Sequence, residues 1–361
     1  MIVKKLQVQK FRNFPDNVFS FSGNTTVIVG VNASGKTNVM EALFLLSTGK
    51  SFRARIEEEM ISYDEDIARV KGSFVEEDVK SGTNLEVVLT RGEIAVGGAF
   101  EKVEKVARKR LLVNGVGKRL LDFAGTFKTV LFGPWDMDLV TGAPSIRRKL
   151  LDSLLSQVDR EYRRASLSYD KGLRQRNKLL FRIREEGVAR SQLLFWDKLL
   201  IKNGDYLTKT REEFIEFCNS HGSFKGHEFI LEYDRSAITE ARLEQYKEEE
   251  VAAATTLVGP HRDDFVFKLK SDKQETVRDL GRYGSRGEQR MGILWLKLEE
   301  LAFIEEKTGQ KPTLLLDDIF SELDHEHRKI VVEAAKKQQT IITTADEHYI
   351  EGIEKVEVIK L

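Results

Sequence analysis

One segment, Gly30-Val-Asn-Ala-Ser-Gly-Lys-Thr37, constrains the fold of this chain more than any other. It matches the pattern G-x-x-x-x-G-K-[ST] and stands between a β-branched run, Thr25–Val29, and an apolar helical stretch over residues 37–46. This context argues against a chance glycine-rich turn and predicts a phosphate-binding loop. Lys36 is expected to reach the β- and γ-phosphates, and the Thr37 hydroxyl to ligate Mg²⁺. The predicted loop comprises Gly30, Val31, Asn32, Ala33, Ser34, Gly35, Lys36 and Thr37.

A second segment, Thr313-Leu-Leu-Leu-Asp-Asp318, is an apolar strand that ends in two carboxylates. Asp317 is expected to support Mg²⁺, directly or through water, and Asp318 to polarise a water for attack on the γ-phosphate. Taken alone, the pair could also be an ordinary turn, because Asp is common after strands. Together with the phosphate-binding loop, it favours an ATP-hydrolysing site. Ser321-Glu-Leu-Asp324 follows and is also suited to cap a helix over residues 325–336.

A third segment, Tyr283-Gly-Ser-Arg-Gly-Glu-Gln-Arg290, opens a predicted helix over residues 288–306. The N-terminus of a helix attracts anions. Since one chain has one triphosphate site with its own loop, we expect this segment to serve a second copy. Ser285 and the amides near Gly287 would contact the γ-phosphate held by the partner's Lys36, so that ATP holds two chains together and hydrolysis releases them. An ordinary helix start capped by Ser285 is the alternative, but it does not explain Arg286 and Gly287.

The order of predicted elements indicates an α/β protein with a helical insertion. Residues 1–143 and 226–361 carry the strands and the three motifs, and residues 144–225 form the insertion. The insertion is expected to hold two antiparallel helices, one from an N-cap at Ser145 to about residue 184 and one over residues 190–218. The remaining predicted elements are strands at Ile2–Val8, Ala68–Val75, Leu85–Thr90, Thr313–Leu316, Thr340–Thr343 and Val356–Leu361, and a hairpin turn at Asn114-Gly115.

Composition narrows the class of protein without naming a ligand. The 361 residues carry 58 Lys and Arg against 58 Asp and Glu, so any nucleic-acid contact must depend on a local basic patch. No apolar run reaches the roughly 20 residues of a membrane span, and the N-terminus resembles no signal peptide. One cysteine, Cys218, excludes an internal disulfide and fits the cytoplasm. No histidine stands at motif spacing around it, so we expect no catalytic thiol.

The three motifs, in this order and with a helical insertion between them, resemble the ATP-binding-cassette heads of the SMC type. More closely, the chain resembles the RecF family of bacterial recombination and repair proteins. Four further stretches extend the similarity over essentially the whole chain: Phe11–Phe14 (FRNF), Ser47–Arg53 (STGKSFR), Pro144–Asp152 (PSIRRKLLD) and Gly259–Phe265 (GPHRDDF).

This resemblance implies an ATPase head of the SMC type with an inserted all-helical arm. It also implies a homodimer that forms on ATP binding, with Mg²⁺, and that binds double-stranded DNA and double-strand/single-strand junctions. Such proteins help to load RecA together with RecO and RecR, and they act in replication restart and the SOS response. Their weak, DNA-stimulated ATP hydrolysis acts as a switch.

The family's functional positions map onto this sequence residue by residue. Asp318 would be the base and Asp317 a Mg²⁺ ligand, while Arg12 and Asn13 would contact the nucleotide. The signature segment, which acts across the dimer, comprises Ser285, Arg286, Gly287, Glu288 and Gln289.

Two departures from the wider cassette pattern bear on hydrolysis. Asp318 stands where most relatives have Glu and is one methylene shorter, which predicts low turnover. The expected switch histidine is replaced by Thr343-Thr-Ala-Asp346, where Thr344 could contribute a hydroxyl. No glutamine loop is assigned.

The helical insertion is also the predicted DNA contact. Residues 145–190 hold 13 Lys and Arg against 6 Asp and Glu, an excess that could neutralise several phosphates. A solvated helix face is the alternative. The basic residues considered are Arg147, Arg148, Arg160, Arg163, Arg164, Lys171, Arg174, Arg176, Lys178, Arg182 and Arg184.

Two other functions fit a phosphate-binding loop less well. The nucleotide-binding subunit of a membrane transporter would carry a Gly-Gly signature and a switch histidine, whereas this chain has Arg286 and Thr344. A small-molecule kinase would leave the signature segment and Ser321–Asp324 without a role.

Overall fold

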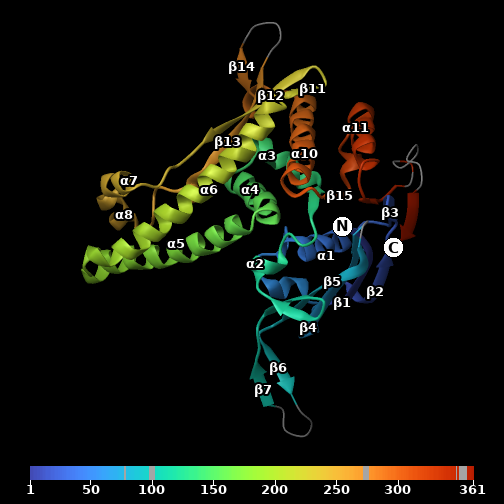
Figure 1. Cartoon of the computed structure of the whole chain (residues 1–361), viewed down its shortest axis with the longest axis horizontal. Coiled ribbons are helices and arrows are strands. Elements are labelled where there is room, and N and C mark those ends of the chain that lie inside the picture. The colour runs from blue at the N-terminus through green and yellow to red at the C-terminus, as the bar shows by residue number, and fades with distance from the viewer. Residues whose placement is uncertain (77–78, 97–101, 271–275, 347, 349–355) are drawn as a thin grey trace. The chain divides into compact units, whose positions relative to one another are not determined.

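The chain forms two compact units. The computed structural model describes residues 1–76, 79–96, 102–270, 276–346, 348 and 356–361 (Figure 1). The first unit combines residues 1–136 with residues 300–361, and the second spans residues 137–299. The second unit therefore extends beyond the helical segment 144–225 predicted as the arm. It also includes a four-stranded sheet and the signature segment.

A five-stranded parallel sheet forms one layer of the first unit. Its order is β10-β15-β16-β3-β17, and each neighbouring pair is parallel. β15 and β16 are buried at every position, as is typical of parallel strands covered on both faces. The carboxyl ends of the strands meet at one edge, where the phosphate-binding loop leaves β3. The strands are β3 (Thr25–Val29), β10 (Thr129–Phe132), β15 (Thr313–Asp317), β16 (Thr340–Thr344) and β17 (Val356–Lys360).

An antiparallel sheet of order β2-β1-β4-β5-β8-β9 forms the other layer. The predicted hairpin is confirmed, because Asn114 and Gly115 both have positive φ, as a two-residue type I′ turn requires. β2 was not predicted: it holds Pro15, which is tolerated here because β2 is an edge strand. The strands are β1 (Ile2–Phe11), β2 (Phe14–Ser20), β4 (Ile67–Glu76), β5 (Val79–Thr90), β8 (Lys109–Val113) and β9 (Val116–Lys118), and a separate hairpin comprises β6 (Glu93–Val96) and β7 (Lys102–Lys105).

The helix that follows the phosphate-binding loop, α1 (Lys36–Thr48), lies between the two sheets (Figure 1). After Lys36 its only charged residue is Glu41, and Val39–Thr48 are all buried. A helix that is apolar all round is stable only inside a core, so α1 anchors the loop to the buried interior of the unit. The other helices assigned to this unit are α2 (Leu120–Phe123) and α11 (His325–Ala335).

The second unit is built on long helices and a small sheet. α5 and α6 have 27 residues each and lie side by side (Figure 1). The antiparallel sheet has the order β11-β12-β13-β14. None of the helices in the described ranges combines the length and apolarity of a membrane span. The elements are α3 (Asp138–Thr141), α4 (Pro144–Val158), α5 (Arg160–Glu186), α6 (Leu194–Ser220), β11 (Ser223–Phe224), β12 (His227–Asp234), α7 (Glu240–Gln245), α8 (Lys247–Ala253), β13 (Asp264–Lys270), β14 (Val277–Asp279) and α9 (Leu280–Tyr283), and α10 (Arg286–Thr308) runs on into the first unit.

The prediction of one helix from Ser145 to about residue 184 was wrong. Two helices, α4 and α5, are separated by Asp159, which has extended backbone angles. The Asp159 carboxylate accepts a hydrogen bond from the Glu161 amide at 2.8 Å and so caps α5. Ser145 is not a cap, because α4 begins at Pro144, whose missing N–H costs nothing at the first helical position.

Two of the family motifs meet inside the second unit. The Arg147 guanidinium binds both carboxylate oxygens of Asp264, at 2.6 and 2.8 Å. Arg211, from α6, donates to the Pro260 carbonyl at 2.7 Å and to the Asp263 carboxylate at 3.0 Å. The motifs PSIRRKLLD and GPHRDDF therefore meet through ion pairs that connect α4, α6 and the start of β13.

His261 belongs to the same buried network. Its Nε2 lies 3.1 Å from the Thr256 carbonyl, so Nε2 carries the proton, and Nδ1 accepts from the Tyr169 hydroxyl at 2.8 Å. Burial lowers the pKa of His261 to about 4.

We expect His261 to make the second unit sensitive to acid. Because its folded pKa of about 4 lies below the ordinary value of 6.5, the unfolded chain takes up the proton more readily. This contribution to stability is complete above the ordinary pKa and is lost as pH falls toward the folded pKa. Between about pH 7.5 and about pH 5.5, the free energy of unfolding should fall by about 1 kcal/mol more in the wild type than in His261→Gln. Urea unfolding at both pH values measures this difference, and parallel losses in the two proteins would contradict it.

Candidate nucleotide-binding site

The loop between β3 and α1 has the form of a phosphate cradle. The Lys36 side chain is 7% exposed, and its Nζ donates to the Gly30 carbonyl at 2.6 Å and to the Val31 carbonyl at 3.0 Å. An ammonium group has three hydrogens, so one remains for a phosphate oxygen. The lysine is thus held in place by the loop that it serves.

Two glycines allow the loop to close on its neighbours. Gly35 has φ +111°, and a Cβ there would lie 2.6 Å from the Phe14 ring. A Cβ on Gly30 would lie 2.5 Å from the Ser34 hydroxyl. At Gly35 the short contact and the positive φ together favour glycine, whereas at Gly30 a Cβ would require the Ser34 hydroxyl to move.

Asn13, predicted to contact nucleotide, braces the loop in this structure. Its side-chain amide donates to the Ser34 carbonyl at 3.1 Å, and its carbonyl accepts from Asn38 at 2.6 Å. Sequence reasoning missed Asn38, which lies one turn into α1. Asn13 therefore fixes the outer edge of the cradle.

Asp317 and Thr37 lie together, as predicted. The Thr37 hydroxyl donates to Asp317 Oδ1 at 3.2 Å, and the Thr343 hydroxyl donates to the same oxygen at 2.6 Å. Burial raises the pKa of Asp317, and the two hydroxyl donors act to lower it.

This pair fits a magnesium ion. Mg²⁺ prefers oxygen ligands and usually takes only one or two from the protein, with phosphates and waters supplying the rest. A threonine hydroxyl and an aspartate carboxylate in contact provide that set. No group of three or more His, Cys, Asp or Glu suited to a metal occurs among the described residues.

Asp318, the predicted base, has a fixed backbone in the left-handed region, with φ 51°. Asp and Asn tolerate this conformation better than other residues with a Cβ. The Asp318 amide donates to the Thr343 carbonyl at 3.1 Å and to its hydroxyl at 3.0 Å. The Asp318 carboxylate makes no hydrogen bond within the described part of the chain, so it is available to a water.

Thr344, considered as a substitute for the switch histidine, is engaged locally. Its hydroxyl donates to the Asp346 carbonyl at 3.1 Å and accepts from the Asp346 amide at 3.2 Å. The helix cap expected from the Ser321–Asp324 segment is present, because Asp324 accepts from the Glu326 and His327 amides at the start of α11.

A buried carboxylate beside the loop holds two arginines. Glu41 is 0% exposed and accepts hydrogen bonds from Arg12 at 2.7 and 2.8 Å and from Arg53 at 2.8 and 3.0 Å. Burial acts to raise the pKa of Glu41, but the bonds from Arg12, Arg53 and Ser51 outweigh it and lower the pKa. Sequence reasoning named Arg12 but missed Glu41 and Arg53, although Arg53 ends the quoted STGKSFR stretch.

The two arginines line a surface hollow of about 810 Å³. Two guanidinium groups share the Glu41 carboxylate on one wall of the hollow, and Arg91, Glu58 and Glu59 line the rest of it, so both signs of charge face this space. The volume is within the range of small-molecule sites, about 300–1,000 Å³. The lining residues are Arg12, Asn13, Asn38, Arg53, Ile56, Glu58, Glu59, Ile61, Tyr63 and Arg91.

The signature segment begins α10, in the second unit, with a reciprocal cap. The Ser285 hydroxyl accepts from the Glu288 amide at 3.2 Å, and the Glu288 carboxylate accepts from the Ser285 amide at 2.7 Å. Gln289 donates to the Leu280 carbonyl at 3.1 Å. Glu288 and Gln289 are thus engaged in the structure of the segment, whereas Ser285, Arg286 and Gly287 are exposed. The capping role considered for Ser285 is confirmed, yet its own O–H remains free to donate.

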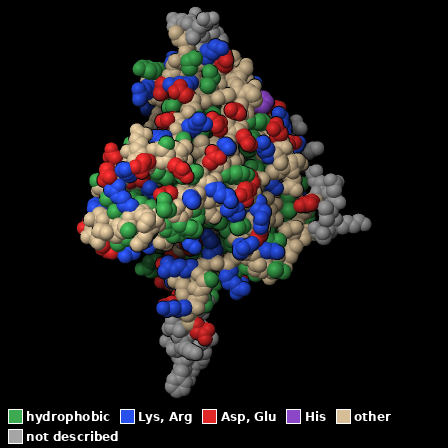
Figure 2. Space-filling model, turned by 60° about the vertical axis from the view of Figure 1, so that its left-hand side comes forward, with side chains coloured by type: hydrophobic (Ala, Val, Ile, Leu, Met, Phe, Trp, Pro, Cys, Tyr) green, Lys and Arg blue, Asp and Glu red, His purple; other side chains and the backbone are tan. Residues whose placement is uncertain are grey.

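The basic residues of the helical segment divide into two groups. Arg147 and Arg176 are buried in ion pairs, the latter with Asp197 and Glu250, and are not available to DNA, contrary to the prediction. Lys171, Arg174 and Lys178 are exposed on α5. Figure 2 shows positive and negative side chains interspersed on one face of the molecule, so attraction of a polyanion must be local.

Comparison with known proteins identifies the family. Residues 2–361 match a family model described as RecF/RecN/SMC N terminal domain. A Herpetosiphon aurantiacus protein named DNA replication and repair protein RecF is 35% identical over 96% of this chain and 94% of its own length. The chain belongs to the RecF family. A further RecF, from Caldanaerobacter subterraneus, is 33% identical over 98% of this chain and 96% of its own length.

Comparison with solved structures gives the same family. One described as the recombination mediator protein RecF-ATPrS in the RecFOR pathway matches with a TM-score of 0.85 and 31% identity, over 99% of this chain and 95% of that one. An SMC head domain derived from Pyrococcus yayanosii matches with a TM-score of 0.55 at 14% identity, which shows the fold alone. The resemblance to RecF and the predicted SMC-type ATPase head are confirmed. Membership of RecF places the chain among DNA replication and repair proteins with an ATP-binding fold.

We expect Gly35→Ala to weaken nucleotide binding. The new Cβ would meet the Phe14 ring at 2.6 Å and would force a side chain into φ +111°. A strain of about 1–3 kcal/mol in the loop predicts a loss of affinity of about tenfold or more. Titration with a fluorescent ATP analogue measures it. Gly117→Ala, in β9, is the control, since no described atom lies within 4 Å of a Cβ there; unchanged binding by Gly35→Ala would refute the loop assignment.

Proposed function

We propose that this RecF-family chain is an ATP-switched DNA-binding protein of recombinational repair, in which ATP joins two copies into a dimer that holds double-stranded DNA. The observation that carries the proposal is the contact between Thr37 and Asp317 beneath a loop that already holds Lys36 in place. Weak, DNA-stimulated hydrolysis then resets the switch.

The chain's own residues divide the work on the triphosphate. The loop amides and the remaining Lys36 N–H bind phosphate oxygens, and Thr37 with Asp317 hold Mg²⁺, which neutralises phosphate charge when it is bound. Arg12 and Arg53, held by Glu41, would contact the rest of the nucleotide. Asp318 orients the attacking water and takes its proton.

The signature segment supplies the missing wall of the site. The Ser285 hydroxyl uses its oxygen to cap α10, so its hydrogen is directed by an already ordered helix start. No described atom lies within 4 Å of a Cβ built on Gly287, so another molecule can approach this backbone closely. Ser285, Arg286 and the Gly287 amide would meet the γ-phosphate held by the partner's Lys36, while Glu288 and Gln289 maintain the segment.

The biological setting follows from the family. Double-strand/single-strand junctions are the proposed DNA targets, and RecR with RecO the proposed partners in loading RecA during replication restart and the SOS response. The support is that a RecF relative is described in the RecFOR pathway. The exposed cations of α5 supply sites for DNA phosphates.

The signature assignment predicts that Ser285→Arg binds ATP normally but fails to pair. Ser285→Asp gives a sharper test, because Asp retains the helix cap but places a negative charge against the phosphate. Light scattering with ATP and Mg²⁺ should report a dimer for the wild type and a monomer for both Ser285 variants.

The same measurement applies to the phosphate-binding loop, where Lys36→Arg should weaken pairing because it weakens nucleotide binding. Ser220→Arg, at an exposed serine of α6, is the control; a normal ATP-dependent dimer of Ser285→Asp would show that the segment does not meet phosphate.

The proposed base predicts a separation of pairing from hydrolysis. Asp318→Asn keeps the left-handed backbone but cannot accept a proton, so the rate of ATP hydrolysis should fall by about 10²-fold or more. The dimer should form and last longer. Steady-state phosphate release and light scattering give the two readouts, with Asp324→Asn as a control at a helix cap. Wild-type turnover by Asp318→Asn would assign the base elsewhere.

A further inference from the structure

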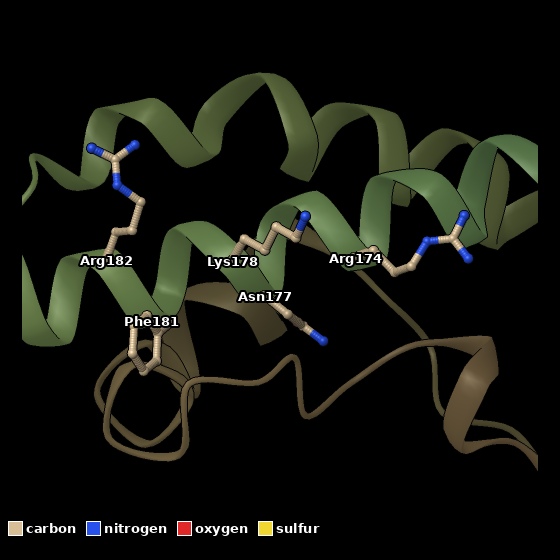
Figure 3. Close-up of a pocket in the computed structure, with 5 residues that line it drawn as sticks. All are labelled: Arg174, Asn177, Lys178, Phe181 and Arg182. Carbon is tan, nitrogen blue, oxygen red and sulfur yellow. The ribbon is translucent and has the colours of Figure 1, made fainter. Parts of the chain in front are cut away.

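A groove runs along the exposed side of α5, between two rows of side chains at four-residue spacing. Arg174, Lys178 and Arg182 form one row, and Asn177 and Phe181 form the other (Figure 3). Residues four apart on a helix stack into a ridge, so the groove is the furrow between adjacent ridges. Its volume is about 510 Å³, and these five residues line it.

Phe181 is the unusual member of this set. Its neighbours Leu180 and Ile183 are buried, whereas Phe181 is 49% exposed. The Arg184 guanidinium lies 5.4 Å from the ring centroid, and Arg184 is itself held by a bond of 3.0 Å to the Ala252 carbonyl. The ring is therefore supported in place, with about half of its surface still open.

The other residues give the groove a positive charge. Arg174 and Lys178 pair with no acidic residue in the described ranges, and Arg182 meets only the exposed Glu186, at 2.9 Å. Exposed ion pairs of this kind contribute little free energy. No carboxylate lines the groove. Asn177 is fixed by bonds from the Thr256 amide and hydroxyl, at 2.9 and 2.7 Å, and holds this edge rigid.

We propose that this groove binds an unpaired stretch of nucleic acid, with one base stacked on Phe181 and the backbone phosphates on Arg174 and Lys178. Proteins that hold single strands combine a basic groove with exposed aromatic rings. The bases of a duplex already stack on one another, so they are not available to stack on the exposed Phe181 ring. The inference rests on the proposed DNA-binding function and assigns the single-stranded side of a junction to this groove. A helix of another protein could also fill such a furrow, but three cations and no carboxylate favour a polyanion.

The test compares Phe181→Ala with a matched exposed phenylalanine on the same helical pair. Phe195 is 65% exposed near the start of α6 and packs edge-on against Trp196 at 4.9 Å. Fluorescence anisotropy of the full chain with ATP and Mg²⁺ is measured on three probes: an oligothymidine strand, a blunt duplex and a junction of the two. Stacking is worth about 1–3 kcal/mol, so Phe181→Ala should weaken binding to the single strand by about 5- to 150-fold and leave the blunt duplex unchanged. Phe181→Trp should restore it, and Phe195→Ala should have no effect.

Two further readouts examine the contact itself. A 2-aminopurine base in the unpaired strand should change its fluorescence with wild-type protein and not with Phe181→Ala. Lys178→Gln should lower the salt dependence of single-strand binding by about one counterion.

Equal losses on duplex and single strand, or the same loss from Phe195→Ala, would overturn the proposal. So would a Phe181→Ala protein that binds every probe normally but changes its oligomeric state, since the groove would then be a protein contact. Wild-type protein that holds the single strand but shows no ATP-dependent binding to duplex would instead refute the proposed switch and leave the groove standing.

Discussion

The register of three parallel strands determines this molecule's chemistry. Asp317 at the end of β15 is paired with Thr343 of β16, and Thr343 with Ile28 of β3. Two residues after Ile28 the chain enters the phosphate-binding loop, and seven residues further Thr37 reaches the Asp317 carboxylate. A shift of one residue in either pairing would turn Asp317 or Thr343 to the opposite face of the sheet. The buried apolar side chains of β15 and β16 make that shift costly, so the core holds the site in register.

Both halves of the proposed composite site are held by hydrogen bonds within the chain. Lys36 is held by the Gly30 and Val31 carbonyls, and Ser285 by its reciprocal bonds with Glu288. Preformed groups lose little conformational entropy on binding, so more of the interaction free energy is left for assembly. The two halves belong to different compact units of the chain. This arrangement suits a switch in which each copy supplies one half to each of two sites.

Much of the nucleotide site could be predicted because its signals are local. The phosphate-binding loop, β3 and β15 follow from short patterns, and the Thr37–Asp317 contact follows from parallel-strand geometry. The arginines of the arm could not be sorted this way: Arg147 resembles a solvated helix residue until Asp264, 117 positions later, is brought to it. Glu41 was hidden for the same reason, because its partners come from two separate turns. The continuous apolar period predicts one helix through Asp159. In the structure the Asp159 side chain instead caps α5, so the helix is interrupted there.

Cross-linking between chains tests the central claim most directly, which is that the signature segment of one copy covers the loop of another. The only native cysteine, Cys218, is buried and gives no background. One preparation would carry Val31→Cys and the other Tyr283→Cys, two residues before Ser285, both at exposed positions. With a short bis-maleimide, the mixture should give a cross-linked heterodimer only when ATP and Mg²⁺ are present, and neither preparation alone should give one. Saturating ATP with no cross-link in the mixture, or equal cross-linking without nucleotide, would contradict the account.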